Sequence, residues 1–248
     1  MKNIIKSLQL CLVFSVFAAY TYGQDVKIIY QNPDFKKEGI SKDFHYINKG
    51  MDISNFQKIA TMKGIGNNSG KQTLDNIFNQ LWESANKLGA NSFRIDNYSN
   101  NNSDSVVVVL SVYKLTPKEL ETNEAFFPRN MIYVFGDLNI KRHAGKRIKL
   151  NGEKVVLLPL EYVSYQNKVG KEATVSIGGF SGSKVWIKWQ ENRLSKYLSL
   201  KGLGIGPGPM YYGQVGISIT TGRLFPVDID FGQFLVEILH EKKFVDRH

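Results

Sequence analysis

Between Met131 and Leu200 the chain breaks into short, regularly spaced segments of alternating apolar and polar residues, and this pattern constrains the fold most strongly. Such segments, separated by turns that contain Gly or Asn, are typical of antiparallel strands. The clearest turn is Asn151-Gly152, a dipeptide that suits a two-residue hairpin with positive φ at both positions. We expect strands at 131–135, 146–150, 153–158, 161–166, 172–177, 184–190 and 194–200. The pattern predicts an antiparallel β-sandwich module over residues 131–248.

The first half of the chain, residues 24–115, mixes strand and helix patterns. Apolar residues three and four apart form one stripe between Lys71 and Leu88, which predicts an amphipathic helix. Gly89 follows in the position of a left-handed C-terminal cap. Strands are expected at 26–30, 58–63, 91–98 and 104–115, and the unbroken apolar run from Val106 to Leu110 predicts that both faces of the last one are covered. This half is therefore predicted to be an α/β-sandwich module, and the whole chain an α+β protein.

Two further segments complete the predicted organisation. Residues 116–130 contain Pro117, Pro128 and several charges, and we interpret them as a linker between the modules. A last helix is expected to begin near Phe231 and to pack on the second module. Asp230, followed three residues later by Gln233, predicts a capping box at its start.

The N-terminus resembles a secretory signal peptide. Lys2 and Lys6 precede a largely apolar run over residues 10–19, and small residues up to Gly23 end it. The run is about half of the ~20 residues that span a bilayer, so we expect cleavage after residue 23 and no stable membrane span thereafter. The mature protein would begin at Gln24, without the single cysteine, Cys11. We expect it in the periplasm or outside the cell, at the cell envelope.

The chain is basic, with a net charge of +10 that becomes +8 when the two leader lysines are removed. This charge favours anionic polymers as partners. The sequence contains no run of five or six lysines and arginines of the kind that marks nucleic-acid-binding tails. For an exported chain, nucleic acid is therefore not an expected partner.

One expected strand carries the candidate binding residues. Strand alternation places Val185, Ile187 and Trp189 on one face, which suits a core. The other face then carries Lys184, Trp186 and Lys188, an indole between two ammonium groups. Such a face is suited to stack on a sugar ring and to neutralise an anionic polymer. The alternative is that Trp186 packs beneath a loop or the first module, with the lysine stems alongside.

No motif specifies a reaction. His240 has no second histidine at metal-ligand spacing, Ser181 lacks the glycine spacing of a nucleophile elbow, and prolines interrupt the glycines of residues 202–208. Asp228 and Asp230 are two residues apart, but the predicted cap accounts for Asp230. We therefore predict no catalytic residue, metal ligand or cofactor. A polymer-acting hydrolase stays open, because catalytic groups meet in space and not in sequence.

Two stretches resemble known domains. Residues 82–95, which end a helix with Leu88-Gly89-Ala90-Asn91, resemble small α+β domains of the bacterial envelope. Residues 131–201 resemble the uncharacterised β-sandwich domain of bacterial envelope lipoproteins, akin to PEGA-type modules, although residues 168–171 replace the usual Pro-Gly turn. The resemblance implies a non-catalytic module that binds or scaffolds an envelope protein. An anionic glycan or other polymer is the alternative ligand.

Overall fold

The computed structural model describes residues 25–37, 39–67, 73–101, 105–177, 182–201, 204–207, 217–220 and 223–244. The expected signal peptide, residues 1–23, lies outside the described residues, as does Ser181. Within the described ranges, no helix is both long enough and apolar enough to cross a membrane.

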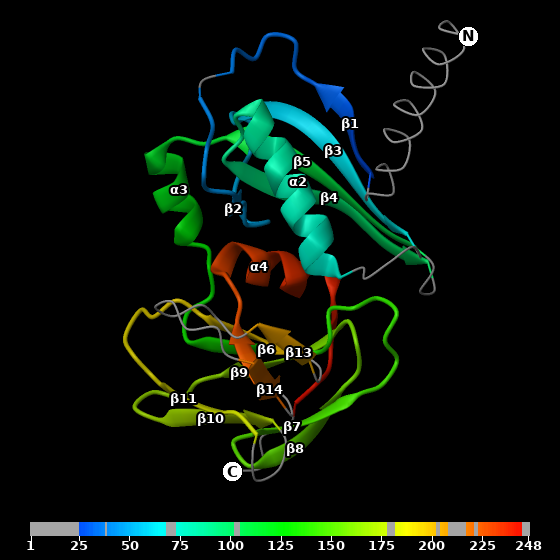
Figure 1. Cartoon of the computed structure of the whole chain (residues 1–248). Helices are drawn as coiled ribbons and strands as arrows, with labels where there is room; N and C mark the ends of the chain where they lie inside the picture. The colour runs from blue at the N-terminus through cyan, green and yellow to red at the C-terminus, as the bar shows by residue number, and fades with distance from the viewer. Residues whose placement is uncertain are drawn as a thin grey trace, which may run out of the picture.

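The first module is a five-stranded sheet with a helix on one face (Figure 1). Its strand order is β1-β3-β5-β4-β2, antiparallel except that β2 runs parallel to β4. The strands are β1 (Asp25–Gln31), β2 (His45–Tyr46), β3 (Gln57–Asn67), β4 (Ser92–Asn101) and β5 (Ser105–Lys114). The predicted helix is confirmed as α2 (Leu74–Leu88), and Gly89 caps it at φ 87°.

Helix α2 covers only one face of this sheet. Its apolar stripe is buried, and Gly64 of β3 lets it approach closely, because a Cβ there would lie 3.0 Å from Leu81 Cδ1. On β5, Val106, Val108 and Leu110 are buried, whereas the intervening valines are partly exposed. The prediction that both faces of this strand are covered is therefore wrong. Among the described residues, no helix covers the face that carries the intervening valines in the way that α2 covers the opposite face.

The second module is a β-sandwich of two sheets, with strand orders β11-β10-β7-β8 and β15-β12-β6-β9-β16. Its strands are β6 (Met131–Phe135), β7 (Lys146–Leu150), β8 (Glu153–Leu157), β9 (Glu161–Gln166), β10 (Glu172–Ile177), β11 (Lys184–Lys188), β12 (Lys196–Lys201), β15 (Arg223–Pro226) and β16 (His240–Glu241). A separate hairpin pairs β13 (Gly204–Pro207) with β14 (Ile217–Thr220). The predicted Asn151-Gly152 turn joins β7 to β8 with φ of 48° and 87°.

The α+β class with a C-terminal helix is confirmed, and the sandwich is antiparallel apart from two pairings. Strand β12 runs parallel to β6, and β16 runs parallel to β9. Between β6 and β12 the chain forms β7 and β8 of the outer sheet, returns to the inner sheet as β9, and then forms β10 and β11 of the outer sheet. Strand β12 finally enters beside β6 in the same direction. Between the sheets lies a closed core to which both contribute, with Val134 and Val175 fully buried.

Residues 116–130 are not a simple linker. They contain helix α3 (Pro117–Glu124), which begins with a complete capping box between Thr116 and Glu119. The side chain of Asn123 is buried and donates to Tyr46 O at 2.7 Å, while its oxygen accepts from Asn48 N at 2.8 Å. The sequence Thr-Pro-Lys-Glu at the start of this segment has a capping residue, a proline at the first helical position and a glutamate three residues after the cap. These residues favour a helix start, although the segment was expected to be a linker.

The last helix, α4 (Ile229–Ile238), lies between the two modules, and not on the second alone as predicted (Figure 1). On one side, the Phe78 ring of α2 lies 4.8 Å from Phe231 and 5.0 Å from Phe234. On the other side, Gly232 packs so closely on Tyr197 of β12 that a Cβ would lie 2.4 Å from the Tyr197 Cγ. One hydrophobic core therefore runs from α2 through α4 to the inner sheet of the sandwich.

Candidate functional site

Strand β11 displays the predicted binding residues on its open side. Val185 and Ile187 pack against the sandwich core, so alternation turns Trp186 outward, where it is 57% exposed. Lys184 and Lys188 are exposed on the same face, and the Lys184 Nζ lies 5.1 Å from the centroid of the Trp186 ring. The predicted division between core and surface is confirmed for residues 184–188, whereas Trp189, also expected in the core, lies after the end of β11 and is only partly buried. The alternative of a Trp186 packed beneath another element is wrong.

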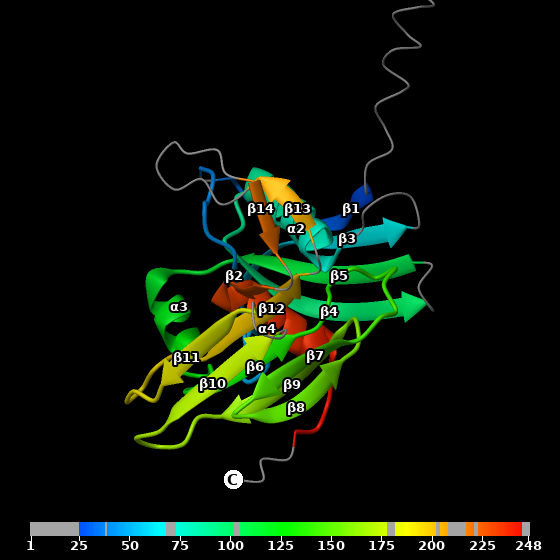
Figure 2. The same ribbon diagram turned by 60° about the horizontal axis from the view of Figure 1, so that its bottom comes forward.

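The strand register extends this surface across the outer sheet. Lys184 pairs with Ser176 of β10, Ser176 with Lys149 of β7, and Lys149 with Lys154 of β8. Paired residues share a face, so three lysines lie in one row across four strands. We name the exposed cationic residues of this surface, together with the indole, the basic face: Arg147, Lys149, Lys154, Lys184, Trp186 and Lys188. Val156 and Glu172 are exposed on the same side of the sheet. Figure 2 brings this sheet forward, with β10 and β11 beside each other.

The positive charges of the basic face outnumber the acidic residues beside them. None of the ion pairs among the described residues includes Lys149, Lys154 or Lys188. The acidic residue nearest in register is Glu172, which pairs with Lys188. Lys149 and Lys154 lie directly opposite each other, an arrangement that costs stability because like charges repel. Sequence reasoning missed this pair, although the Asn151-Gly152 hairpin places the two lysines opposite each other.

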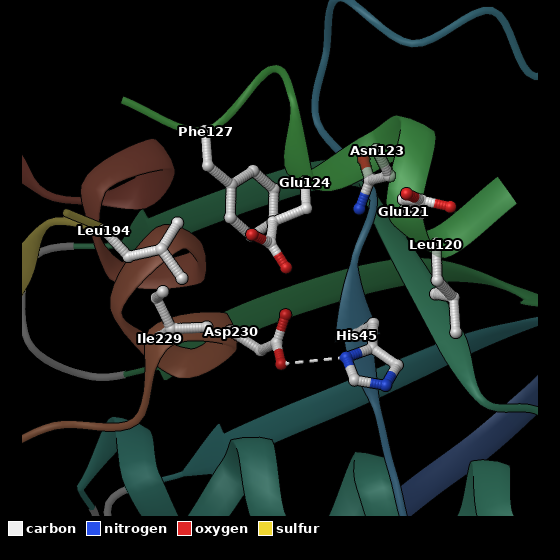
Figure 3. Close-up of a pocket in the computed structure, with 9 residues that line it drawn as sticks. All are labelled: His45, Leu120, Glu121, Asn123, Glu124, Phe127, Leu194, Ile229 and Asp230. Carbon is white, nitrogen blue, oxygen red and sulfur yellow. Dashed lines mark hydrogen bonds and ion pairs between the residues drawn. The ribbon is translucent and has the colours of Figure 1, made fainter. Parts of the chain in front are cut away.

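A second feature is a cleft of about 240 Å³ between the modules (Figure 3). Its walls come from β2, α3 and α4. Four ionisable side chains face it, together with Asn123 and four apolar residues: His45, Glu121, Glu124 and Asp230, with Leu120, Phe127, Leu194 and Ile229. Its ionisable groups come from segments nearly two hundred residues apart, which explains why the sequence did not reveal it.

Asp230 does not cap helix α4, which corrects the prediction. The helix begins at Ile229, so the cap is Asp228, whose Oδ1 accepts from Asp230 N at 2.9 Å. The side chain of Asp230 instead reaches β2. Its Oδ1 accepts from Tyr46 N at 2.8 Å, and its Oδ2 lies 3.2 Å from His45 Nδ1.

The cleft is acidic within a basic protein. The hydrogen bond to Asp230 raises the pKa of His45; burial opposes this shift, and the charges of Asp230, Asp43 and Asp228 add to it. Glu124 lies 3.5 Å from Arg129 Nη1, which offsets part of the negative charge. The imidazole is therefore held in its protonated form to a higher pH than a free histidine.

Just beyond the cleft, a second carboxylate of α4 binds the same segment. Glu237 accepts from the Tyr46 hydroxyl and lies 3.0 Å from Lys49 Nζ. Burial, and then the bond to Glu237, raise the pKa of Tyr46 well above its ordinary value. Asp230 and Glu237 thus fasten β2 and the residues after it along the length of α4.

The cleft has carboxylates and one imidazole as its ionisable groups. Its nine described lining residues include no serine, threonine, cysteine or lysine, and both oxygens of Asp230 are engaged by β2. Across the residues that the structure describes, no three potential ligands are grouped to hold a metal ion. His240 lies in β16, exposed, and not in a final helix turn. The contacts of Asp230 and Asn123 fasten β2, α3 and α4 to one another at this cleft.

Comparison with known proteins adds no assignment: no family model, no curated protein and no solved structure matches the chain.

Proposed function

We propose that this chain is an exported, non-catalytic binding protein of the bacterial cell envelope, and that it holds an anionic polymer on the basic face. Export rests on the leader-like pattern of residues 1–23. The binding role rests on one observation above all: Trp186 is 57% exposed on a strand whose opposite face already fills the core.

The packing of strand β11 does not require an outward indole. Burying a large apolar side chain typically contributes about 1.5–3 kcal/mol, and Trp186 forgoes much of this. Ile187 and Val185 already pack β11 onto the sandwich. An exposed aromatic residue beside cationic side chains is a common feature of binding surfaces.

The charge pattern supports an anionic polymer as the ligand. The basic face carries five cationic side chains, and the register places one acidic residue, Glu172, beside them. The opposed pair Lys149 and Lys154 repel each other in the free protein, and an anionic group between them would relieve that repulsion. A polymer with repeated negative charges matches the basic face both in length and in having the opposite charge.

Retention on immobilised dextran sulfate tests the proposal. The mature protein should be retained at low salt and released as salt rises, because exposed charges are screened over ~8–10 Å at physiological ionic strength. The double variant Lys149→Glu/Lys154→Glu should elute much earlier. The chain offers a matched control in Lys27→Glu/Lys63→Glu, another opposed lysine pair, on β1 and β3 of the first module. Equal losses in the two double variants would mean that net charge alone governs retention and would refute the proposed surface.

A further inference from the structure

We infer that the ligand of the basic face is a linear acidic polysaccharide, which crosses strands β8, β7, β10 and β11 with one sugar ring stacked on Trp186. This inference rests on the proposed function and makes it more specific. It also assigns unequal roles to the residues of the basic face.

The basic face has the dimensions of an extended chain. Neighbouring strands lie about 4.8 Å apart, so Lys154 and Lys149 are one strand apart, and Lys149 and Lys184 are two strands apart. The lysine row therefore extends over roughly 14 Å. Trp186 stands two residues along β11 from Lys184, about 7 Å away along the strand. A polymer following the row would meet several cations and then reach the indole at one end.

The indole distinguishes a glycan from other polyanions. Within the described part of this face Trp186 is the sole aromatic residue, whereas proteins that bind single-stranded nucleic acid stack successive bases on several aromatic rings. A polyphosphate has no ring to stack. A sugar ring presents an apolar C–H face to an indole and directs its polar substituents sideways. In the free protein Lys184 Nζ lies over the indole ring, 5.1 Å from its centroid, so a sugar stacked on that face would move this ammonium group toward the edge of the ring.

The charges on the two sides of Trp186 are unequal. On one side, Lys184 continues through Ser176 to Lys149 and Lys154. On the other side, Lys188 pairs with the acidic Glu172, which weakens the attraction for an anion there. The anionic substituents should therefore lie along the row of Lys184, Lys149 and Lys154, while Lys188 contributes little.

The test compares three polymers on the mature, full-length protein: polygalacturonate, polyphosphate and uncharged dextran. Polygalacturonate should bind most tightly and dextran not measurably. The single variant Trp186→Ala should weaken polygalacturonate binding by about tenfold or more, as expected for lost ring stacking, and leave polyphosphate binding unchanged. Lys149→Ala/Lys154→Ala should weaken both anionic polymers, and Lys188→Ala should change neither by more than about twofold.

Tyr30→Ala is the matched control, because Tyr30 is a 48% exposed aromatic residue with Lys58 Nζ 5.9 Å from its ring, on the first module. It should leave polygalacturonate binding unchanged. If Trp186→Ala fails to fold, Trp186→Tyr and Trp186→Leu replace it: the ring-bearing variant should bind and the aliphatic one should not.

Two outcomes separate this inference from the proposed function. If polyphosphate binds as tightly as polygalacturonate and the Trp186 variants change neither, the protein binds polyanions by charge alone and the polysaccharide inference is wrong. If neither anionic polymer binds, the proposed function itself is wrong.

Discussion

Asp230 of α4 and His45 of β2 lie in contact, 3.2 Å apart, although 185 residues separate them in the sequence. The same carboxylate accepts from Tyr46 N, so one side chain fixes the strand at the edge of the first sheet to the helix between the modules. The contact joins an early segment of the described chain to a late one, and protonation of the histidine strengthens it.

The stability of the protein should therefore depend on pH through His45. Its folded-state pKa is raised, chiefly by the bond to Asp230, so its contribution is present below the ordinary value of 6.5 and is lost as pH rises through the folded-state pKa. Urea unfolding should give a larger difference between wild type and His45→Gln at pH 5.5 than at pH 8. The side chain is 35% exposed, so we expect no more than about 1 kcal/mol. His143→Gln, at an exposed histidine before β7, is the matched control.

Gly232→Ala should destabilise the protein, although it replaces glycine within a helix. Helix propensity alone would favour alanine by about 1 kcal/mol. The new Cβ would lie 2.4 Å from Tyr197 Cγ, and overpacking of this kind costs about 1–3 kcal/mol. We expect a lower melting temperature by differential scanning calorimetry, whereas Ser84→Ala on α2 should lower it little or raise it. An unchanged or raised melting temperature for Gly232→Ala would contradict the close packing of α4 on β12.

Asn123→Ala should loosen the segment between the modules. The substitution removes the partners of Tyr46 O and Asn48 N and should cost about 1–3 kcal/mol, because these groups lose hydrogen bonds in a largely buried setting. Trypsin should cleave after Lys118 or Arg129 sooner in this variant than in wild type. The neighbouring exposed substitution Thr122→Ala should change stability by less than about 0.5 kcal/mol. Early cleavage in wild type would show that the segment is a free linker after all.

Protein recovered from its native host should begin at or near Gln24. Intact-mass measurement checks this, because removal of the leader also removes Cys11 and two lysines. A mass that retains Met1, or an acyl chain on Cys11, would overturn the expected processing.

The sequence predicted the elements whose periodicity is local. The stripe of α2, the Asn151-Gly152 hairpin and the alternation of β11 depend on neighbouring residues, and the structure confirms each. Helix α3 also carries a local signal, the capping box formed by Thr116 and Glu119, although the segment was expected to be a linker. These features follow from propensity and spacing within one element.

The relations between elements were not predictable in this way. The contact between Asp230 and His45 depends on the packing of α4 beside β2, which no local pattern indicates. Helix α4 also begins two residues earlier than expected, so the residue before it, and not Asp230, is the cap, and Asp230 makes the contact instead. The row of Lys154, Lys149 and Lys184 depends on the order of four strands, of which a single hairpin was foreseen. Apolar side chains such as Phe78 indicate burial and do not indicate their partner, here Phe234 of α4.

The position of α4 has a consequence for the timing of folding. Its rings of Phe231 and Phe234 complete the packing around Phe78, yet they are among the last described residues to be synthesised. The first module therefore lacks part of its core while most of the chain is being made, and it closes only when the helix emerges.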